Sequence, residues 1–276
     1  MENYLEFIKK PQEGRTFRAA LFDFDGTLSL IREGWQEVMV PYFVEVLSAA
    51  PGAAGETEAE LTAIVREFVD RLTGKQTIFQ CMALDDAVAE RGGSRCDPMI
   101  YKDEYLRRLY LRINDRLEGL RSGKIAPTEL LVRGTEEFLQ KLCDMGIALY
   151  LASGTDQPAV REEAKLLGVD RFFGEHIYGA LDEHATACTK ELVIRRILSE
   201  TGLTGEELLS FGDGYVEIEL VAGLGGYAVA VATDEKTRAG VDPWKRERLI
   251  AAGASAVVPD FAEPDTLADL IRNRED

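Results

Sequence analysis

The sequence predicts an α/β fold in which a doubly wound parallel sheet is interrupted by one long helical insertion. Short apolar runs rich in β-type residues alternate with helical stretches, which is the pattern of parallel strands joined by crossover helices. Small or acidic residues follow directly after three of these runs, at the strand ends where such sheets bind ligands. The strand-like runs are missing between residues 30 and 133, where helical periodicity takes over.

Five short apolar runs predict buried strands, because each is short and three of them lead into small or acidic residues. In chain order they are Arg18 to Phe22, Ile147 to Ala152, Leu208 to Phe211, Tyr227 to Thr233, and Ala256 to Val258. Between them, Thr135 to Met145 and Lys190 to Thr201 are typical of helices. Together these segments predict the α/β part of the molecule.

The helical insertion runs from about Leu30 to Arg133. Its clearest helix is predicted over Pro98 to Leu120, because apolar residues recur there at helical spacing and Gly123 follows as a stop signal. We therefore predict an α/β core domain formed by residues 1–29 and 134–276, and a helical domain formed by residues 30–133.

The chain of 276 residues is acidic, with 49 Asp and Glu against 32 Lys and Arg and a formal net charge of −17. Most of that excess lies in residues 134–276, which hold 27 acidic and 14 basic side chains. Nucleic acids and anionic membranes attract basic surfaces, so the charge argues against both as partners.

The sequence also predicts a cytoplasmic protein. No apolar run approaches the ~18 residues of a membrane span, and the first residues lack the basic-then-apolar order of a signal peptide. Four cysteines, Cys81, Cys96, Cys143 and Cys188, lie far apart without a Cys-x-x-Cys pair, which favours reduced thiols over a disulfide frame or a zinc site.

Two carboxylates follow the first predicted strand in the segment Asp23-Phe24-Asp25-Gly26-Thr27, where Gly26 permits a tight turn. Alone, such a turn only suggests a site, because acidic turns after strands are also common in solvated loops. Three further pieces follow in order: Ser153 after the second strand, Lys190 at a helix start, and Gly212 to Glu217 after the third strand.

With these four pieces the chain resembles the haloacid dehalogenase superfamily, and within it the phosphatases with a helical, C1-type cap. The motifs of that family are an Asp-x-Asp after the first strand, a Ser or Thr, a Lys, and an acidic pair, and the resemblance spans about Phe17 to Leu270. It implies a Rossmann-like core and assigns residues 30–133 as the cap domain. The second Asp of the first motif favours phosphate esters, because dehalogenases of the family lack it.

Phosphoryl transfer needs a nucleophile, an acid for the leaving oxygen, and positive charge at the phosphoryl oxygens. Asp23 is the expected nucleophile and would form an aspartyl phosphate. Asp25, two residues on, is expected to protonate the leaving alkoxide and then to deprotonate the attacking water.

Mg²⁺ is the expected cofactor, because Asp23, Asp213 and Glu217 would otherwise repel a phosphate dianion. The ion prefers oxygen ligands in octahedral geometry, which the carboxylates of Asp23 and Asp213 and the backbone carbonyl of Asp25 would supply. Glu217 stands where many relatives carry Asp, so its longer side chain is expected to act through a water. Glu219 is a competitor that does not fit the motif spacing.

Ser153 and the backbone N–H groups around Gly154 are expected to bind a phosphoryl oxygen of the substrate. The Lys190 ammonium would pair with another oxygen and steady Asp23. Lys165 is a rival for this role, but it follows Ser153 too soon in the chain order.

The segment Thr73-Gly74-Lys75-Gln76-Thr77 joins two predicted helices of the insertion. Lys75 in this segment is expected to contact the substrate, although a plain connector explains the segment equally well. It is not a P-loop, because the preceding glycine and the Ser or Thr of that motif are missing.

Arg108, Arg112 and Arg116 fall on one helical stripe and either receive an anionic substrate or, with more weight, form a solvated face. Trp35 and Glu33 either line the cleft between the two domains or pack inside the cap.

Other segments carry no predicted role. His176 and His184 are typical of surface residues, and Val241 to Arg248 predicts an exposed lead into a helix.

The sequence therefore predicts a Mg²⁺-dependent phosphatase that acts on a small phosphorylated metabolite, an anionic phosphoester, with no nucleic-acid or membrane partner. A monomer or a small homo-oligomer is expected. The alternatives are a phosphomutase of the β-phosphoglucomutase type, which keeps the same core residues, and a non-catalytic binding protein with this fold.

Overall fold

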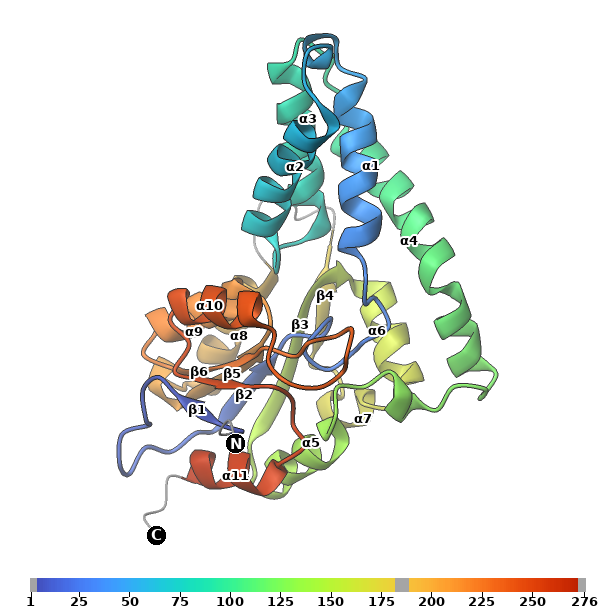
Figure 1. The fold of residues 1–276 in the computed structure, drawn as a ribbon. Coiled ribbons are helices and arrows are strands. Elements are labelled where there is room, and N and C mark those ends of the chain that lie inside the picture. Colours follow the sequence, from blue (N-terminus) through green and yellow to red (C-terminus); the bar gives the residue numbers. More distant parts are fainter. Residues whose placement is uncertain (1–3, 182–188, 273–276) are drawn as a thin grey trace.

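A seven-stranded sheet forms the centre of the computed structural model, which describes residues 4–181 and 189–272 (Figure 1). The strand order is β1-β7-β6-β5-β2-β3-β4, and only β1 is antiparallel to its neighbour. The strands are β1 (Glu6–Phe7), β2 (Ala19–Phe22), β3 (Ala148–Asp156), β4 (Ile177–Ala180), β5 (Leu208–Gly212), β6 (Tyr227–Val231) and β7 (Ala256–Val258).

All five predicted strands are present, and two further strands were not predicted. The edge strand β1 is only two residues long, and β4 carries Gly179, which weakens strand propensity. The strand predicted to end at Ala152 continues to Asp156, with an irregular register against β4 beyond Ala152. Ser153 therefore lies within the last part of β3 and not after it.

The parallel register brings the ends of β2, β3 and β5 together. Phe22, the last residue of β2, lies opposite Leu151 of β3 and Phe211 of β5. Its ring stacks on that of Phe211 with the centroids 4.7 Å apart, in a core that is closed to solvent. The residues that follow these strands consequently share one edge of the sheet.

Helices cover both faces of the sheet, as the doubly wound prediction requires (Figure 1). One face carries α5 (Thr135–Asp144), α6 (Gln157–Leu166), α7 (Asp170–Phe173) and α11 (Pro264–Arg272). The other face carries α8 (Thr189–Thr201), α9 (Tyr215–Gly223) and α10 (Pro243–Ala251). Short 3₁₀ turns lie at Pro51–Ala53, Pro127–Glu129 and Gly205–Glu207.

Four helices rise from the carboxyl edge of the sheet and form what we call the helical unit (Figure 1). They are α1 (Gln36–Ser48), α2 (Glu58–Leu72), α3 (Thr77–Glu90) and α4 (Pro98–Arg121). All four lie inside the predicted insertion, and α4 confirms the helix predicted from Pro98. Helix α1 contacts the other three, and α4 also contacts α6 of the α/β part.

Within the described ranges 4–181 and 189–272, no helix combines the length and apolar character that crossing a bilayer requires.

Candidate active site

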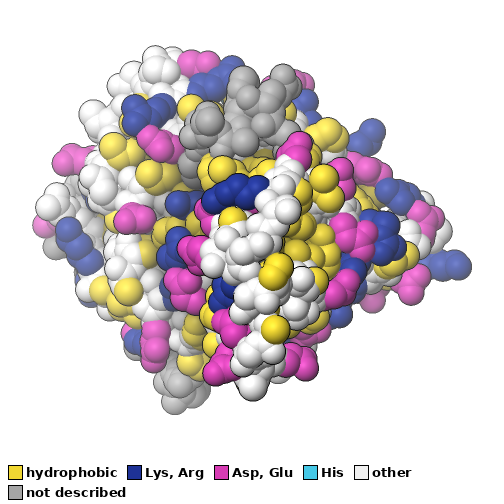
Figure 2. All heavy atoms as spheres, turned by 90° about the horizontal axis from the view of Figure 1, so that it is seen from above, with side chains coloured by type: hydrophobic (Ala, Val, Ile, Leu, Met, Phe, Trp, Pro, Cys, Tyr) yellow, Lys and Arg dark blue, Asp and Glu magenta, His cyan; other side chains and the backbone are white. Residues whose placement is uncertain are grey.

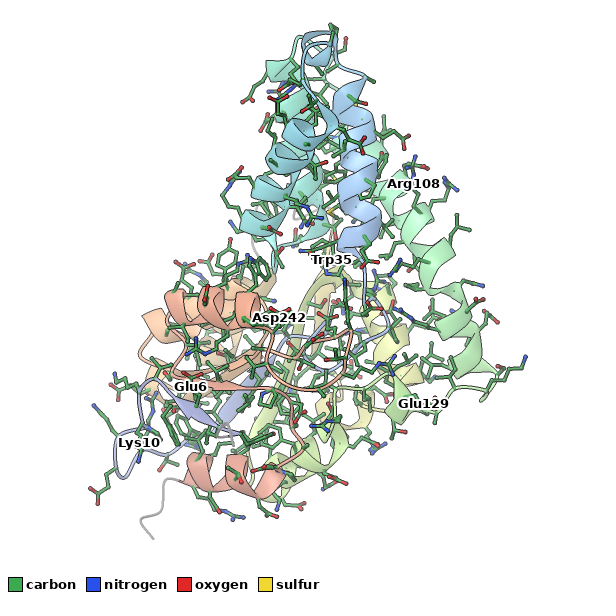
Figure 3. The ribbon with its side chains drawn as sticks, in the orientation of Figure 1. Glu6, Lys10, Trp35, Arg108, Glu129 and Asp242 are labelled. Atoms are coloured by element: carbon green, nitrogen blue, oxygen red, sulfur yellow. The ribbon has the colours of Figure 1, made fainter. Side chains whose placement is uncertain are left out.

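A cavity lies where the helical unit meets the carboxyl edge of the sheet. Seven of the eight predicted site residues line it: Asp23, Asp25, Lys75, Ser153, Gly154, Lys190 and Asp213. The helical unit adds Trp35, which Figure 3 shows at the base of α1, directly above the sheet edge. Residues far apart in the sequence thus share one small space of about 90 Å³.

Lys190 is buried between two carboxylates. Its Nζ lies 2.9 Å from Asp23 Oδ2 and 2.6 Å from Glu217 Oε2, and only 1% of the residue is exposed. The other Glu217 oxygen, Oε1, accepts a hydrogen bond of 3.1 Å from the Gly214 backbone N–H. Both oxygens of Glu217 are therefore engaged by the protein, and the residue lies behind Lys190 instead of lining the cavity.

The three charges of this group shift one another's pKa. Burial raises the pKa of the Asp23 carboxyl, and the nearby Asp213 and Asp25 add to that effect, against the lowering by Lys190. Burial likewise raises the pKa of Glu217. Burial alone would lower the pKa of Lys190, but the two adjacent carboxylates outweigh it and keep the ammonium charged.

Asp25 is held by one of its two carboxyl oxygens. Its Oδ2 accepts hydrogen bonds from Thr155 Oγ1 at 2.8 Å and from Ser153 Oγ at 3.2 Å. Its Oδ1 is buried and has no hydrogen-bond partner. Burial, together with the charge of Glu163, raises the pKa of Asp25 to about 6 despite the opposing effect of Arg32. A carboxyl group with such a pKa suits an acid that must also act as a base.

Asp213 reaches the cavity from the end of β5. Gly26, at a positive φ of 77°, lets the loop after β2 pass so close that a Cβ there would lie 2.2 Å from Asp213 Oδ2. The same Asp213 oxygen accepts a hydrogen bond of 2.8 Å from Lys245 Nζ, which also bonds Glu235 Oε1 at 2.6 Å. Lys245 is buried, so these two carboxylates share one enclosed ammonium.

Two carboxylates at the sheet edge, those of Asp23 and Asp213, fit a Mg²⁺ site. Asp23 and Asp213 leave neighbouring strands at the same edge, and their repulsion contributes to the raised pKa of Asp23. Such repulsion between oxygen ligands is what a hard divalent cation offsets. Among the described residues, no three His, Cys, Asp or Glu side chains converge to hold a metal by themselves. The remaining ligands would be a backbone carbonyl, as predicted for Asp25, and waters.

The loop between α2 and α3 covers the site. A Cβ on Gly154 would lie 2.5 Å from the Lys75 carbonyl oxygen, and a Cβ on Gly74 would lie 3.3 Å from Gly214 Cα. From the α/β part, Arg248 donates hydrogen bonds to the Asp70 and Thr73 carbonyls at the end of α2. The segment from Thr73 to Thr77 is thus packed onto the sheet edge, which is more than a plain connector requires.

The arginine stripe of α4 is paired within the protein and does not line the cavity. Arg108 pairs with Glu45 and Glu104, Arg112 with Glu37, and Arg116 with Glu33. Arg108 extends from α4 toward α1, where its guanidinium also lies 4.4 Å from the Tyr42 ring centre (Figure 3). Seen from above, the molecule carries basic and acidic side chains interspersed (Figure 2). The stripe therefore joins α4 to α1 and to the segment before it, with Arg108 and Arg116 only partly exposed.

The rival candidates lie away from the cavity. Lys165 and Glu219 are exposed on α6 and α9. His176 is partly buried, and its ring lies 4.6 Å from that of Tyr150. His184 and Cys188 lie outside the described residues, and the other three cysteines are free thiols.

Sequence reasoning missed two buried ion pairs that border the site. Arg32 pairs with Glu163 beside Asp25, and Lys245, from the segment without a predicted role, pairs with Asp213. One signal was present for Arg32: a charged residue directly after the apolar run Leu28-Ser29-Leu30-Ile31. The sequence holds no comparable signal for Glu163 or Lys245.

Comparisons with known proteins agree with the motifs. A model of the haloacid dehalogenase-like hydrolases matches residues 17–225. A 5′-nucleotidase from Pseudomonas aeruginosa is 28% identical over 193 residues, which cover 70% of this chain and 72% of that protein.

Solved structures share the fold at low identity. A structure described as a predicted phosphatase from Clostridium acetobutylicum superposes with a TM-score of 0.59 at 18% identity, covering 92% of this chain and 99% of that one. A haloacid dehalogenase family hydrolase from Deinococcus radiodurans, with phosphate and sodium bound, superposes with a TM-score of 0.53 at 18% identity, covering 94% and 98%.

Proposed function

The chain belongs to the haloacid dehalogenase-like hydrolases, and we propose that it is a Mg²⁺-dependent phosphatase acting on a small phosphorylated metabolite in the cytoplasm. The observation that carries this proposal is the shared cavity of Asp23, Asp25, Ser153, Lys190 and Asp213. This space of about 90 Å³ admits a phosphoryl group beside these side chains. The 5′-nucleotidase relative and the phosphate-bound neighbour support a phosphoester substrate.

Asp23 is the nucleophile of the proposed reaction. The Lys190 Nζ lies 2.9 Å from Asp23 Oδ2, and the Phe24 backbone N–H donates a hydrogen bond of 2.8 Å to Asp23 Oδ1. These two contacts hold the carboxylate at the edge of the cavity. Attack on phosphorus forms a bond to an Asp23 oxygen as the bond to the leaving alcohol oxygen breaks.

Asp25 supplies the proton for that leaving oxygen. Its Oδ2 accepts hydrogen bonds from Ser153 and Thr155, and its buried Oδ1 has no hydrogen-bond partner. In the second half of the reaction the same carboxylate takes a proton from the water that hydrolyses the aspartyl phosphate.

Positive charge for the phosphoryl oxygens comes from Lys190 and from the metal. Bound Mg²⁺, held by Asp23, Asp213 and the Asp25 carbonyl, would neutralise developing charge on the transferred group. Glu217 keeps Lys190 in place from behind. Gly154 and Lys75 border the cavity from the sheet and from the loop above it, where they would contact the phosphoryl group and its alcohol.

Release of inorganic phosphate tests the proposal. With Mg²⁺ present, the wild-type protein is expected to release phosphate from members of a panel of phosphorylated sugars, nucleotides and carboxylates. Asp23→Asn removes the nucleophile and is expected to lower the rate at least ~10³-fold. Unchanged hydrolysis by that variant would contradict the role of Asp23. Conversion of a sugar phosphate into its isomer without free phosphate would identify a mutase instead.

A further inference from the structure

Arg248 of helix α10 reaches from the α/β part into the helical unit. Helix α10 lies below α2 in Figure 1, and the Arg248 Nη2 donates to the Asp70 carbonyl and lies 3.5 Å from the Thr73 carbonyl oxygen. Both carbonyls lie at the carboxyl end of α2, where C=O groups lack the regular N–H partners of the helix interior. A guanidinium is a suitable partner there, because the carboxyl end of a helix carries a partial negative charge.

Two aromatic rings hold the same guanidinium. Its central carbon lies 5.0 Å from the ring centre of Tyr215, at the start of α9, and 5.1 Å from that of Trp244, one helical turn earlier on α10. The other terminal nitrogen, Nη1, is buried and has no hydrogen-bond partner among the described residues. A buried donor without a partner destabilises the folded protein, so stability alone does not explain this arrangement.

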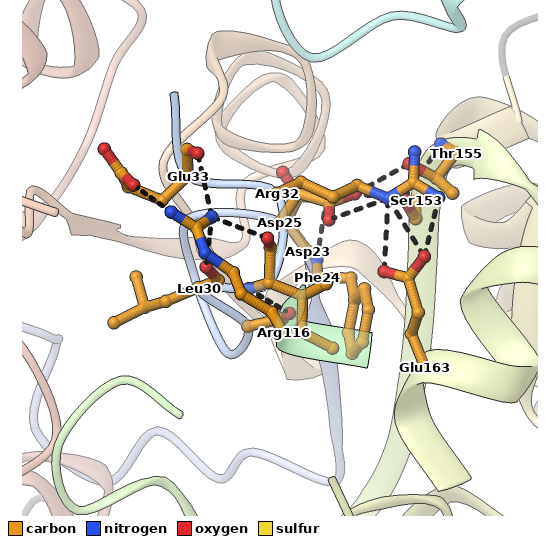
Figure 4. Close-up of polar contacts among 12 residues, drawn as sticks. Asp23, Phe24, Asp25, Leu30, Arg32, Glu33, Arg116, Ser153, Thr155 and Glu163 are labelled. Carbon is orange, nitrogen blue, oxygen red and sulfur yellow. Dashed lines mark hydrogen bonds and ion pairs between the residues drawn. The ribbon is translucent and has the colours of Figure 1, made fainter. Parts of the chain in front are cut away.

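The arginine beside Asp25 is held in a different way. Arg32 donates from Nε and Nη2 to the Glu163 carboxylate, so a group of opposite charge neutralises it (Figure 4). Arg248 instead bonds backbone oxygens of the helical unit. Its hydrogen bonds therefore fix the position of a helix end.

The end of α2 leads directly into the loop that covers the site. Thr73, Gly74 and Lys75 all line the cavity. Gly74 lies against Gly214, since a Cβ on Gly74 would lie 3.3 Å from Gly214 Cα, and a Cβ on Gly214 would lie 3.1 Å from Gly74 Cα. The place of the carboxyl end of α2 thus decides where Gly74 and Lys75 lie.

We propose that Arg248 is a positioning residue that clamps the carboxyl end of α2 to α10 and thereby holds Gly74 and Lys75 over the cavity. The inference rests on the proposed phosphatase function and adds a residue to it. Arg248 does not itself line the cavity, so it acts through the loop and not on the phosphoryl group. Without the clamp, the loop covers the cavity for only a fraction of the time, and the apparent affinity for the substrate falls by that fraction.

Hydrogen exchange of the free protein tests the clamp without reference to catalysis. Arg248→Met removes the donors, and exchange of the backbone amides in residues 73–77 is expected to become at least ~5-fold faster, while exchange in β2 and β5 stays as in the wild type. Arg246→Met is the matched control, because Arg246 lies on the same helix and carries the same charge but bonds Glu6 of β1. It is expected to change the exchange of the loop less than ~2-fold.

Steady-state kinetics with p-nitrophenyl phosphate and Mg²⁺ test the consequence for the reaction. In Arg248→Met the KM is expected to rise at least ~5-fold, while kcat stays within ~3-fold of the wild type because the groups at the phosphorus are untouched. Arg246→Met should keep both constants within ~2-fold of the wild type. Trp244→Leu removes one of the two rings at a position that is 46% exposed, and it is expected to speed the exchange of the loop and raise the KM by about 3-fold.

The outcomes separate the clamp from the phosphatase function. Unchanged exchange of the loop in both Arg248→Met and Trp244→Leu would overturn the clamp, as would equally fast exchange in Arg246→Met. A fall in kcat at unchanged KM would also overturn it, since Arg248 would then act in the chemical step. If Arg248→Met does not fold, Trp244→Leu carries the test. Faster exchange of the loop in a protein that releases no phosphate from any substrate would support the clamp and refute the phosphatase function.

Discussion

Asp25 affects both the reaction and the stability of the fold. The buried carboxyl group that serves the reaction as an acid destabilises the folded protein when it ionises. Its pKa is raised to about 6, chiefly by burial. A carboxyl group with a raised pKa prefers the protonated form in the folded state. Its contribution to stability is therefore complete below the unfolded pKa of about 4 and is lost as the pH rises through about 6.

Asp25→Asn is expected to remove that pH dependence. The free energy of unfolding of the variant, relative to the wild type, should increase by about 1 kcal/mol between pH 5 and pH 8, because only the wild type has the Asp25 contribution that is lost there. Denaturant unfolding at both pH values with a chelator present measures it. Asp144→Asn, at an exposed position of α5, is the control and should show no such change. If the free energy of unfolding of Asp25→Asn and of the wild type depended on pH in the same way, the pKa of Asp25 would not be raised by burial.

At the scale of elements, the loop between α2 and α3 matters because its backbone lies on the sheet edge. Gly154→Ala would place a methyl group 2.5 Å from the Lys75 carbonyl oxygen, so one of the two backbones must move. We expect kcat/KM for phosphate esters to fall at least ~10-fold, with little loss of global stability because the loop can yield outward. Steady-state kinetics and thermal unfolding measure the two effects.

Gly223→Ala is the matched control for that variant. Gly223 ends α9, and a Cβ there meets nothing within 4 Å, so activity should stay at the wild-type level. An active Gly154→Ala enzyme would mean that the packing of the loop on the sheet edge does not matter for the reaction.

The strands and their terminal motifs could be predicted because their signals are local. A short apolar run followed by Asp23 or by Gly212-Asp213 contains both the strand and the polar residue that it delivers. The parallel register then brings these residues together without any further information. Strand β4 was missed because its local signal is weak: the run Ile-Tyr-Gly-Ala is short and contains a glycine.

The charged pairs around the motifs could not be predicted because they join distant segments. Arg32 and Glu163 are 131 residues apart in the chain, and Lys245 reaches Asp213 from a helix whose sequence indicates only a helix start. Glu217 was expected near the metal through a water, but its two oxygens bond Lys190 and the Gly214 N–H. Which partner a buried charge selects is decided by tertiary packing, for which this sequence carries no local pattern.

For the whole molecule, a net charge of −17 means that the site gathers carboxylates in a field that already repels anions. A bound Mg²⁺ would relieve this, so the ion should stabilise the folded protein independently of catalysis. At ~100 times its dissociation constant it is expected to raise the free energy of unfolding by about 2.7 kcal/mol, and the melting temperature by several degrees.

Thermal unfolding with Mg²⁺ and with a chelator measures this effect. Asp213→Asn removes a proposed ligand and should abolish most of the rise in melting temperature. Glu219→Gln changes an exposed carboxylate of the neighbouring helix α9 and should leave the rise intact. A rise that survives Asp213→Asn undiminished would place the ion elsewhere on this acidic surface.

Helix α4 connects the helical unit to the α/β part of the molecule. Its 24 residues span about 36 Å, so it belongs to the helical unit at one end and lies against α6 at the other. Lys102 bonds Asp156 at the end of β3 at 2.7 Å, and Arg121 bonds Glu162 of α6 at 2.5 Å. A helix held by ion pairs at two separate positions cannot rotate about either position alone. Movement of the helical unit away from the α/β part would therefore have to break at least one of these two ion pairs.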